Sequence, residues 1–242
     1  MSPCDININQ FEFKDSKKLD NPTLYRAIVG SLIYIMCSSR CDLAYIVTKL
    51  SQYMSEPTHA HLNIAKNVLK YLKGTKNYQI KFNRCKCSLN IFGYCDSDYA
   101  ADSDRKSTSG YCFQLCNDGP LISWKSKKQN VVSLSSCEAE YNSLTYAIQE
   151  GKFLVQLFSD MCNAEKTSFD LFVDNRAAIL LAKNPVYHQR SKHISVKYHF
   201  ARDEVQKNNV QLLYVPTDQN IGDIFTKPTS RPKLLKFNIF GK

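Results

Sequence analysis

Four acidic residues occupy positions where a carboxylate could bind a metal ion: Asp96, Glu140, Asp174 and Asp223. Asp96 follows an apolar run, and so does Asp174. Ligands of α/β sheets gather at the ends of strands, so a carboxylate in such a place is a candidate metal ligand. An Asp after an apolar strand is also a common turn residue or helix N-cap, and neither residue decides between these interpretations alone.

Glu140 occupies an unusual position for a charged residue. The segment Ser135-Ser-Cys-Glu138 matches a capping box, which gives Glu138 a structural role. Glu140 then falls on the apolar stripe of the same predicted helix, with Leu144, Ala147 and Ile148. Burying an unpaired charge is costly, so a metal ion shared with Asp96 and Asp174 would explain this position. The alternative is a Glu at the helix edge that reaches solvent.

Asp223 opens the last predicted helix, where a negative charge is favourable in any protein. Taken together, the four carboxylates suit hard divalent cations such as Mg²⁺, which take oxygen ligands. Two such ions, about 4 Å apart, can hold a phosphodiester, activate a water molecule and stabilise the leaving oxygen. Mn²⁺ accepts the same ligands, so the residue types do not choose between the two metals. No Gly-rich phosphate loop and no Gly-x-Ser-x-Gly motif offers a competing site.

The composition is that of a folded, basic protein. The chain has 242 residues, of which 43% are hydrophobic, enough for one large core or two small ones. Its formal net charge of +10 suggests a polyanionic partner. The longest apolar run, near Ala27–Cys37, is about half as long as a membrane span, and the N-terminal segment lacks the pattern of a signal peptide. We therefore expect an intracellular protein with no membrane partner, whose ten cysteines are ordinary reduced thiols.

The hydrophobic pattern changes near residue 85. From Pro22 to Thr75 the apolar residues recur with a helical period, whereas strands predominate after Lys86. The order of elements in the second part predicts an α/β domain with a mixed sheet covered by helices on both faces. Its predicted strands are Leu89–Asp96, Ser109–Cys116, Pro120–Lys127, Phe169–Asp174 and Val210–Pro216. Its predicted helices are Glu138–Phe158, Arg176–Lys183, Val196–Lys207 and a final helix whose first part is Ile221–Lys227.

Two groups of basic residues could contact phosphates. A predicted helix after Thr58 carries a basic stripe opposite its core face: Lys66, Lys70 and Lys73. The third predicted strand combines an aromatic residue with cations: Trp124, Lys125, Lys127 and Lys128. No acidic residue occurs from Pro57 to Cys95, which favours phosphate contact by the stripe. A solvated helix face and a core Trp beside an exposed turn are the respective alternatives.

Longer motifs run through both parts of the chain. They are Tyr25-Arg-Ala-Ile-Val-Gly-Ser-Leu-Ile-Tyr34, Lys70-Tyr-Leu-Lys-Gly-Thr75, Gly93-Tyr-Cys-Asp-Ser-Asp-Tyr-Ala100, Asp104-Arg-Lys-Ser-Thr-Ser-Gly-Tyr111, Ile122-Ser-Trp-Lys-Ser-Lys-Lys-Gln129, Leu134-Ser-Ser-Cys-Glu-Ala-Glu-Tyr141, Val173-Asp-Asn175, Arg190-Ser-Lys-His-Ile194, Tyr198-His-Phe200 and Asp223-Ile-Phe-Thr-Lys-Pro228. In order and spacing, the last eight resemble the ribonuclease H region of copia-type retrotransposon polyproteins. The first two resemble the end of the reverse transcriptase that precedes it.

The resemblance implies a ribonuclease H-like fold for residues 86–242, with a mixed five-stranded sheet flanked by helices. Residues 1–85 would be a small helical remnant of the reverse transcriptase thumb or connection. The four carboxylates would bind the catalytic metals, and the substrate would be the RNA strand of an RNA–DNA hybrid, cut during reverse transcription. Further substrate contacts would come from Arg190, Lys192 and His193. The rest of the polyprotein would be a partner, in a cytoplasmic retroelement particle and in the nucleus.

The chain also departs from the family pattern. The Tyr-x-Asp-Asp motif of reverse transcriptases is absent, so we expect no polymerase activity. Ser195 stands where the family usually has Asp, and Gly222 where it commonly has Ala, but neither is a predicted ligand. Three functions stay open: an active ribonuclease H, a catalytically silent remnant that binds nucleic acid, and a subunit that cuts only with a separate reverse transcriptase. The four intact carboxylates favour the first and the third.

Overall fold

The computed structural model describes residues 2–4, 16–82, 90–116, 119–163, 168–184 and 195–237. They form two compact units, one of Phe82–Thr226 and one of Met1–Lys81 together with Lys227–Lys242. The boundary expected from the sequence lies near residue 85, with residues 227–242 in the second part. In the structure the C-terminal segment joins the first unit, where Ser2 Oγ donates a hydrogen bond to the Thr229 carbonyl (2.6 Å).

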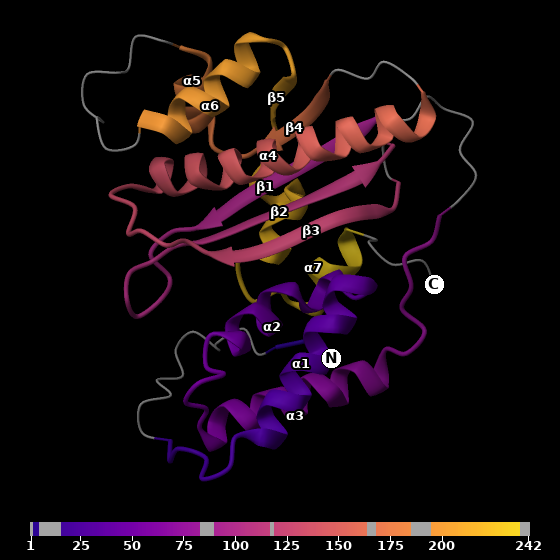
Figure 1. Ribbon diagram of the computed structural model, residues 1–242, viewed down its shortest axis with the longest axis vertical. Helices are drawn as coiled ribbons and strands as arrows, with labels where there is room; N and C mark the ends of the chain where they lie inside the picture. Colours follow the sequence, from indigo (N-terminus) through magenta and orange to yellow (C-terminus); the bar gives the residue numbers. More distant parts are fainter. Residues whose placement is uncertain are drawn as a thin grey trace. The chain divides into compact units, whose positions relative to one another are not determined.

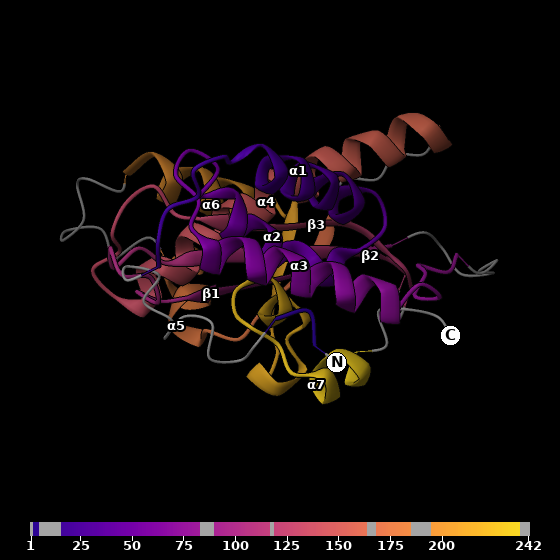
Figure 2. The same cartoon turned by 90° about the horizontal axis from the view of Figure 1, so that it is seen from below.

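The first unit is helical, as its hydrophobic period predicts. Helix α1 (Thr23–Ser38) packs against both α2 (Ala44–Ser51) and α3 (His59–Gly74) (Figure 2). Buried apolar residues of the three helices form one core. The Thr58 side chain accepts a hydrogen bond from the His61 amide and so caps α3. The 3-10 helix η3 (Cys41–Leu43) precedes α2, and α7 (Arg231–Lys236) lies in the C-terminal segment.

A buried ion pair connects η3 to α3. Arg40 donates two hydrogen bonds to the Asp42 carboxylate, from Nε to Oδ1 (3.0 Å) and from Nη2 to Oδ2 (2.8 Å). The Tyr71 hydroxyl donates to Asp42 Oδ2 (2.6 Å), and Arg40 Nη2 also reaches Thr75 Oγ1 (2.7 Å). Because both charges are almost fully buried, each depends on the other for compensation.

Replacing Asp42 with Asn is therefore expected to lower the free energy of unfolding by about 3–5 kcal/mol, because it removes the negative charge that the buried Arg40 guanidinium contacts through two hydrogen bonds. Urea unfolding of the full chain measures this change. The exposed Asp20 of the same unit provides the control, and Asp20→Asn is expected to change stability by less than about 0.5 kcal/mol. An Asp42→Asn variant as stable as this control would contradict the role of the ion pair.

The second unit contains a mixed five-stranded sheet in the order β3-β2-β1-β4-β5 (Figure 1). Strands β1, β2 and β3 form an antiparallel meander, whereas β1 pairs with β4, and β4 with β5, in parallel. This confirms the expected α/β class and number of strands. The strands are β1 (Ile91–Asp98), β2 (Thr108–Leu115), β3 (Leu121–Lys128), β4 (Phe169–Val173) and β5 (Val210–Tyr214).

Three α-helices contribute to the core on one face of this sheet: α4 (Ser136–Cys162), α5 (Arg176–Lys183) and α6 (Ser195–Gln206). The long helix α4 runs across β1 and β2 (Figure 1). Tyr111 of β2 belongs to this core, whereas the adjacent Gly110 faces Phe225 on the opposite side of the sheet. In the described part of the second unit, the opposite face is thus contacted by a short 3-10 helix, η7 (Ile221–Phe225), rather than by an α-helix.

The expectation of an α-helix from Ile221 is wrong in type. The backbone there forms i→i+3 bonds, such as Thr226 N to the Asp223 carbonyl (3.4 Å), and the tighter helix ends at Phe225. Pro228 follows shortly after and disfavours helical geometry in the residue before it.

Two general expectations can be compared with the described residues. The eight cysteines that the structure describes form no disulfide with one another, and four of them are exposed or half-buried: Cys4, Cys37, Cys137 and Cys162. Among the helices within the described ranges, none is both long enough and apolar enough to cross a membrane.

Candidate metal centre

Parallel pairing of β1 and β4 brings two of the four carboxylates together. Cys95 is the partner of Val173 in the register of these strands, so Asp96 and Asp174 follow at the same level. Asp96 lies inside β1, which continues to Asp98, whereas Asp174 comes directly after the end of β4. The apolar residues that precede both carboxylates are buried in the core and fix the two strands side by side.

The third carboxylate, that of Glu140, comes from α4, just after the first turn of this helix. Ser135 Oγ accepts a hydrogen bond from the Glu138 amide (3.1 Å), which confirms the predicted N-cap. The Glu138 carboxylate accepts from the Leu134 amide (2.7 Å), one residue before the position that a complete capping box would use. The Glu138 carboxylate is thus engaged in a hydrogen bond at the start of the helix. Glu140, by contrast, is buried, with 7% of its surface exposed.

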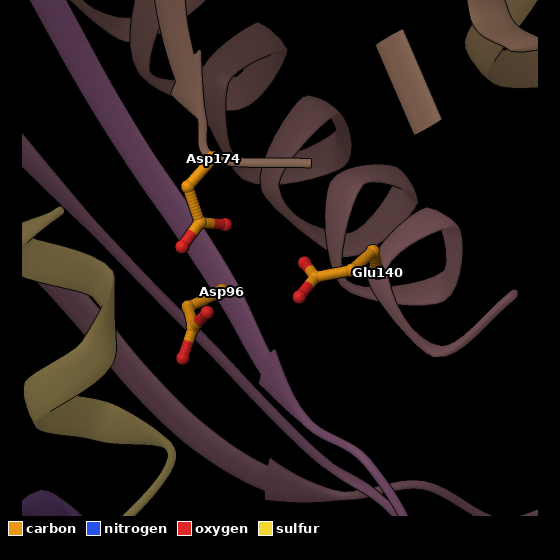
Figure 3. Close-up of side chains that lie close together, drawn as sticks. All are labelled: Asp96, Glu140 and Asp174. Atoms are coloured by element: carbon orange, nitrogen blue, oxygen red, sulfur yellow. The ribbon is translucent and has the colours of Figure 1, made fainter. Parts of the chain in front are cut away.

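Asp96, Glu140 and Asp174 point toward one another (Figure 3). One ligand oxygen from each lies within 4.8 Å of the others. Glu140 Oε2 is buried and accepts no hydrogen bond from any residue that the structure describes. Burial, followed by the charges of Asp96 and Asp174, raises the pKa of Glu140 to about 9. An acceptor-only site of three crowded carboxylates fits a divalent cation, which would replace the proton that Glu140 otherwise holds.

Asp223 is not a member of the set within 4.8 Å, but its segment is held against the site. Asp223 is 1% exposed and lies on η7, which contacts β1. The Asn220 side chain donates a hydrogen bond to the Cys95 carbonyl (2.9 Å). A Cβ on Gly222 would stand 3.0 Å from the Asp96 nitrogen, so glycine permits the close approach of this segment to β1.

Several polar residues that the sequence reasoning did not single out position the site. Ser143 of α4, fully buried, donates a hydrogen bond to the Asp96 carbonyl (2.6 Å) and lies 3.2 Å from the Gly110 carbonyl. This contact fixes α4 to the strand that carries Asp96. Its only sequence signal is a small polar residue on an otherwise apolar stripe.

Gln129 makes a second connection between the sheet and the start of α4. Its Nε2 donates to Ser109 Oγ of β2 (2.9 Å) and to the Ala139 carbonyl (3.0 Å), directly before Glu140. Its Oε1 accepts from Ser133 Oγ (2.9 Å) and from Asn142 Nδ2 (3.4 Å). All the hydrogen-bonding groups of this buried amide are thus used. Gln129 therefore sets the position of the helical turn from which Glu140 extends.

If the chain cuts RNA–DNA hybrids, as the resemblance implies, we expect Gln129→Leu to lower the turnover about tenfold, equivalent to about 1.4 kcal/mol, with little change in KM for the hybrid. The change displaces the turn that carries Glu140 but touches no substrate-facing group. Steady-state kinetics with a labelled hybrid separates kcat from KM. The matched control is Gln114→Leu, since Gln114 is also buried in β2 but donates to Gly119 at the far end of the strand. Equal losses in both variants would mean that Gln129 acts only on stability.

The four candidate nucleic-acid residues of β3 do not form one cluster. Alternation along the strand places Lys125 and Lys127 beside Tyr111 and Ser109, on the face that α4 covers, and Trp124 and Lys128 on the other face. Lys128 is engaged in ion pairs with Asp102 (2.9 Å) and Asp104 (3.1 Å).

Lys125 and Lys127 instead line a cavity of about 220 Å³ beside α4. The ammonium of Lys127 lies 4.5 Å from the centre of the Tyr146 ring, and the Glu150 carboxylate accepts a hydrogen bond from Ser123 Oγ (2.6 Å). These two lysines are therefore separated from Trp124 and lie near an acidic side chain.

The remaining basic candidates lie elsewhere. Lys66, Lys70 and Lys73 are exposed on α3 of the first unit, as the helical period predicts. Arg190, Lys192 and His193 lie outside the residues that the structure describes.

Comparisons with known proteins identify the family. The chain is 40% identical over 221 residues to the retrovirus-related Pol polyprotein from transposon RE1 of Arabidopsis thaliana. The aligned region covers 91% of this chain and 15% of the polyprotein. The chain is 37% identical over 210 residues to the corresponding polyprotein from transposon TNT 1-94 of Nicotiana tabacum, covering 86% of this chain and again 15% of the relative.

No family model matches the chain. A solved structure with similarity is the N-terminal RNase H domain of Rv2228c from Mycobacterium tuberculosis, with a TM-score of 0.44 and 11% identity over 57% of this chain and 91% of that one. The two polyproteins are much longer than this chain, which spans about 15% of their length. On the sequence identity over nearly its whole length, the chain belongs to the family of copia-type retrotransposon Pol polyproteins.

Proposed function

We propose that this chain is the ribonuclease H part of such a polyprotein and hydrolyses the RNA strand of RNA–DNA hybrids. The observation that carries the proposal is the set of buried Asp96, buried Glu140 and half-buried Asp174, with ligand oxygens within 4.8 Å of one another. Three acidic groups so close together, two of them buried, oppose one another's ionisation, which a structural role alone does not explain. The resemblance of its motifs to the ribonuclease H region of such polyproteins suggests RNA–DNA hybrids as the substrate class.

The three carboxylates would hold Mg²⁺ or Mn²⁺, and we propose two ions, with Asp223 as a fourth ligand. When bound, such ions supply an activated water and stabilisation of the leaving oxygen. The protein's part is to hold its carboxylates in a fixed arrangement: Ser143 and the strand pairing fix Asp96 and Asp174, and Gln129 fixes the turn of Glu140. A rigid site of this kind lowers the cost of arranging charge during reaction.

Basic residues would hold the phosphate backbone without reading sequence. We propose this role for the exposed stripe of α3, for the β3 residues Trp124, Lys125, Lys127 and Lys128, and for Arg190, Lys192 and His193. Among the β3 residues, the exposed Lys125 is the best placed and Lys128 the least, because Lys128 is held by two carboxylates. Binding through phosphates weakens steeply with salt, and a hybrid is recognised by its groove shape and 2′-hydroxyls.

The first unit is proposed to be the end of a reverse transcriptase, without polymerase activity of its own. In the intact element it would join the ribonuclease H part to the polymerase, in cytoplasmic particles and in the nucleus.

Cleavage of labelled nucleic acids by the full chain tests the proposal. We expect Mg²⁺ or Mn²⁺ to support cutting of the RNA strand in an RNA–DNA hybrid, and EDTA to stop it. Duplex DNA and single-stranded RNA serve as substrates that should remain intact. Cutting restored only by an added reverse transcriptase would identify a dependent subunit. Hybrid binding without cutting under both conditions would contradict the proposal and favour a silent remnant.

A further inference from the structure

The segment that follows η7 touches the candidate metal centre through one side chain. Thr226 Oγ1 donates a short hydrogen bond to Asp96 Oδ2. Thr226 is 0% exposed and Asp96 is 3% exposed, so water does not compete for this contact. The two residues are separated by 130 positions in the chain. The bond therefore connects the last part of the second unit directly to a carboxylate of the cluster.

The surroundings of Thr226 leave its side chain little freedom. Its methyl carbon lies 2.7 Å from the position that a Cβ on Gly110 would occupy, so it fills the space left by that glycine. With the methyl group fixed there, the hydroxyl is directed to the other side, toward Asp96. The Asp223 carbonyl lies 3.2 Å from the same hydroxyl oxygen and is a second, longer acceptor.

The segment as a whole is anchored to β1. Asn220 is fully buried, donates from Nδ2 to the Cys95 carbonyl (2.9 Å) and accepts at Oδ1 from the Gly222 amide (3.0 Å). Gly222 allows the backbone to lie directly against Cys95 and Asp96. Thr226 is thus presented to Asp96 by a rigid support and does not reach it by chance.

We propose that Thr226 is a positioning residue that fixes the Asp96 carboxylate for cation binding. Its hydrogen bond keeps Asp96 Oδ2 engaged and so restricts rotation of the carboxylate plane. Residues that hydrogen-bond to metal ligands orient these ligands. Loss of such a residue typically weakens metal binding by about ten- to a hundredfold. The inference rests on the proposed metal-dependent function, because it assumes that the cluster binds a cation.

Calorimetric titration of the full chain with Mn²⁺ tests this inference through a matched pair of variants. Thr226→Val keeps the shape of the side chain but removes the hydroxyl, and we expect its Kd for Mn²⁺ to rise about tenfold. Thr226→Ser keeps the hydroxyl and is expected to stay within about threefold of the unmodified chain. Thermal unfolding of the metal-free proteins shows whether both variants are folded.

The possible outcomes separate the two proposals. If the unmodified chain binds no Mn²⁺, the proposed function fails. If it binds Mn²⁺ and Thr226→Val binds equally well, the function stands and the role of Thr226 is overturned. If Thr226→Val does not fold, NMR of the unmodified chain decides: we expect a Thr226 hydroxyl proton protected from exchange, and a rapidly exchanging one overturns the inference.

Discussion

Replacing Asp174 with Asn is expected to lower hybrid cleavage by about three orders of magnitude, equivalent to about 4 kcal/mol of transition-state stabilisation. Asn is nearly the same size as Asp but provides no negative charge for a cation. Asp174 is half-buried and follows the end of β4, so the exchange should leave the fold intact. Single-turnover cleavage of a labelled hybrid in Mg²⁺ measures the effect.

Asp170→Asn provides the control for this experiment. Asp170 is also half-buried and lies near the start of β4, whereas Asp174 follows the end of this strand. It is expected to keep cleavage within about twofold, because surface changes away from special features rarely matter. If Asp174→Asn kept more than about a tenth of the activity, Asp174 would not be one of the groups that the chemistry requires.

A second large effect is expected from the proton on Glu140. Its pKa of about 9 in the metal-free protein means that the folded chain holds a proton there at neutral pH, whereas the unfolded chain, with a value near 4.5, does not. In this window the folded state binds more protons than the unfolded one, so the metal-free protein should lose stability as pH rises from about 5 to 9. Glu140→Gln should remove this dependence.

Cation binding should be coupled to the same proton. A cation needs the ionised carboxylate, so its affinity should rise by about tenfold per pH unit below the pKa of about 9. Calorimetric titration with Mg²⁺ in buffers of different ionisation enthalpy, at two pH values, would count the released protons. Glu138→Gln is the matched control, since Glu138 lies in the same helical turn but serves the cap. Binding with no proton release would contradict the coupling.

The sequence was sufficient to predict the five strands and the helices α4, α5 and α6, and it also predicted the residue types of the cluster. Strand patterns before Asp96 and Asp174 predict two strand ends, and the helical stripe identifies Glu140 rather than Glu138 as the inward-facing carboxylate. The structure adds that β1 and β4 are parallel neighbours. Strand order depends on contacts between distant segments, so the local pattern could not provide it.

Other features depend on such contacts even more strongly. Thr226 and Gln129 stand inside motifs that mark the family, but nothing in their local pattern says that one meets Asp96 and the other Ala139. The contacts of η7 with β1 and β2 likewise join segments that are far apart in the sequence. By contrast, the placement of the β3 candidates on opposite faces of the sheet was predictable. Side chains alternate along a strand, which already separates Trp124 and Lys128 from Lys125 and Lys127.

Anomalous diffraction from crystals of the chain soaked in Mn²⁺ tests the central claim most directly, because it locates the ion itself. The account predicts a peak bonded to oxygens of Asp96, Glu140 and Asp174, at a Mn²⁺ concentration that also supports hybrid cleavage in solution. Its absence there at such a concentration, or a peak bound only to other residues, would contradict the assignment of this cluster as the metal centre.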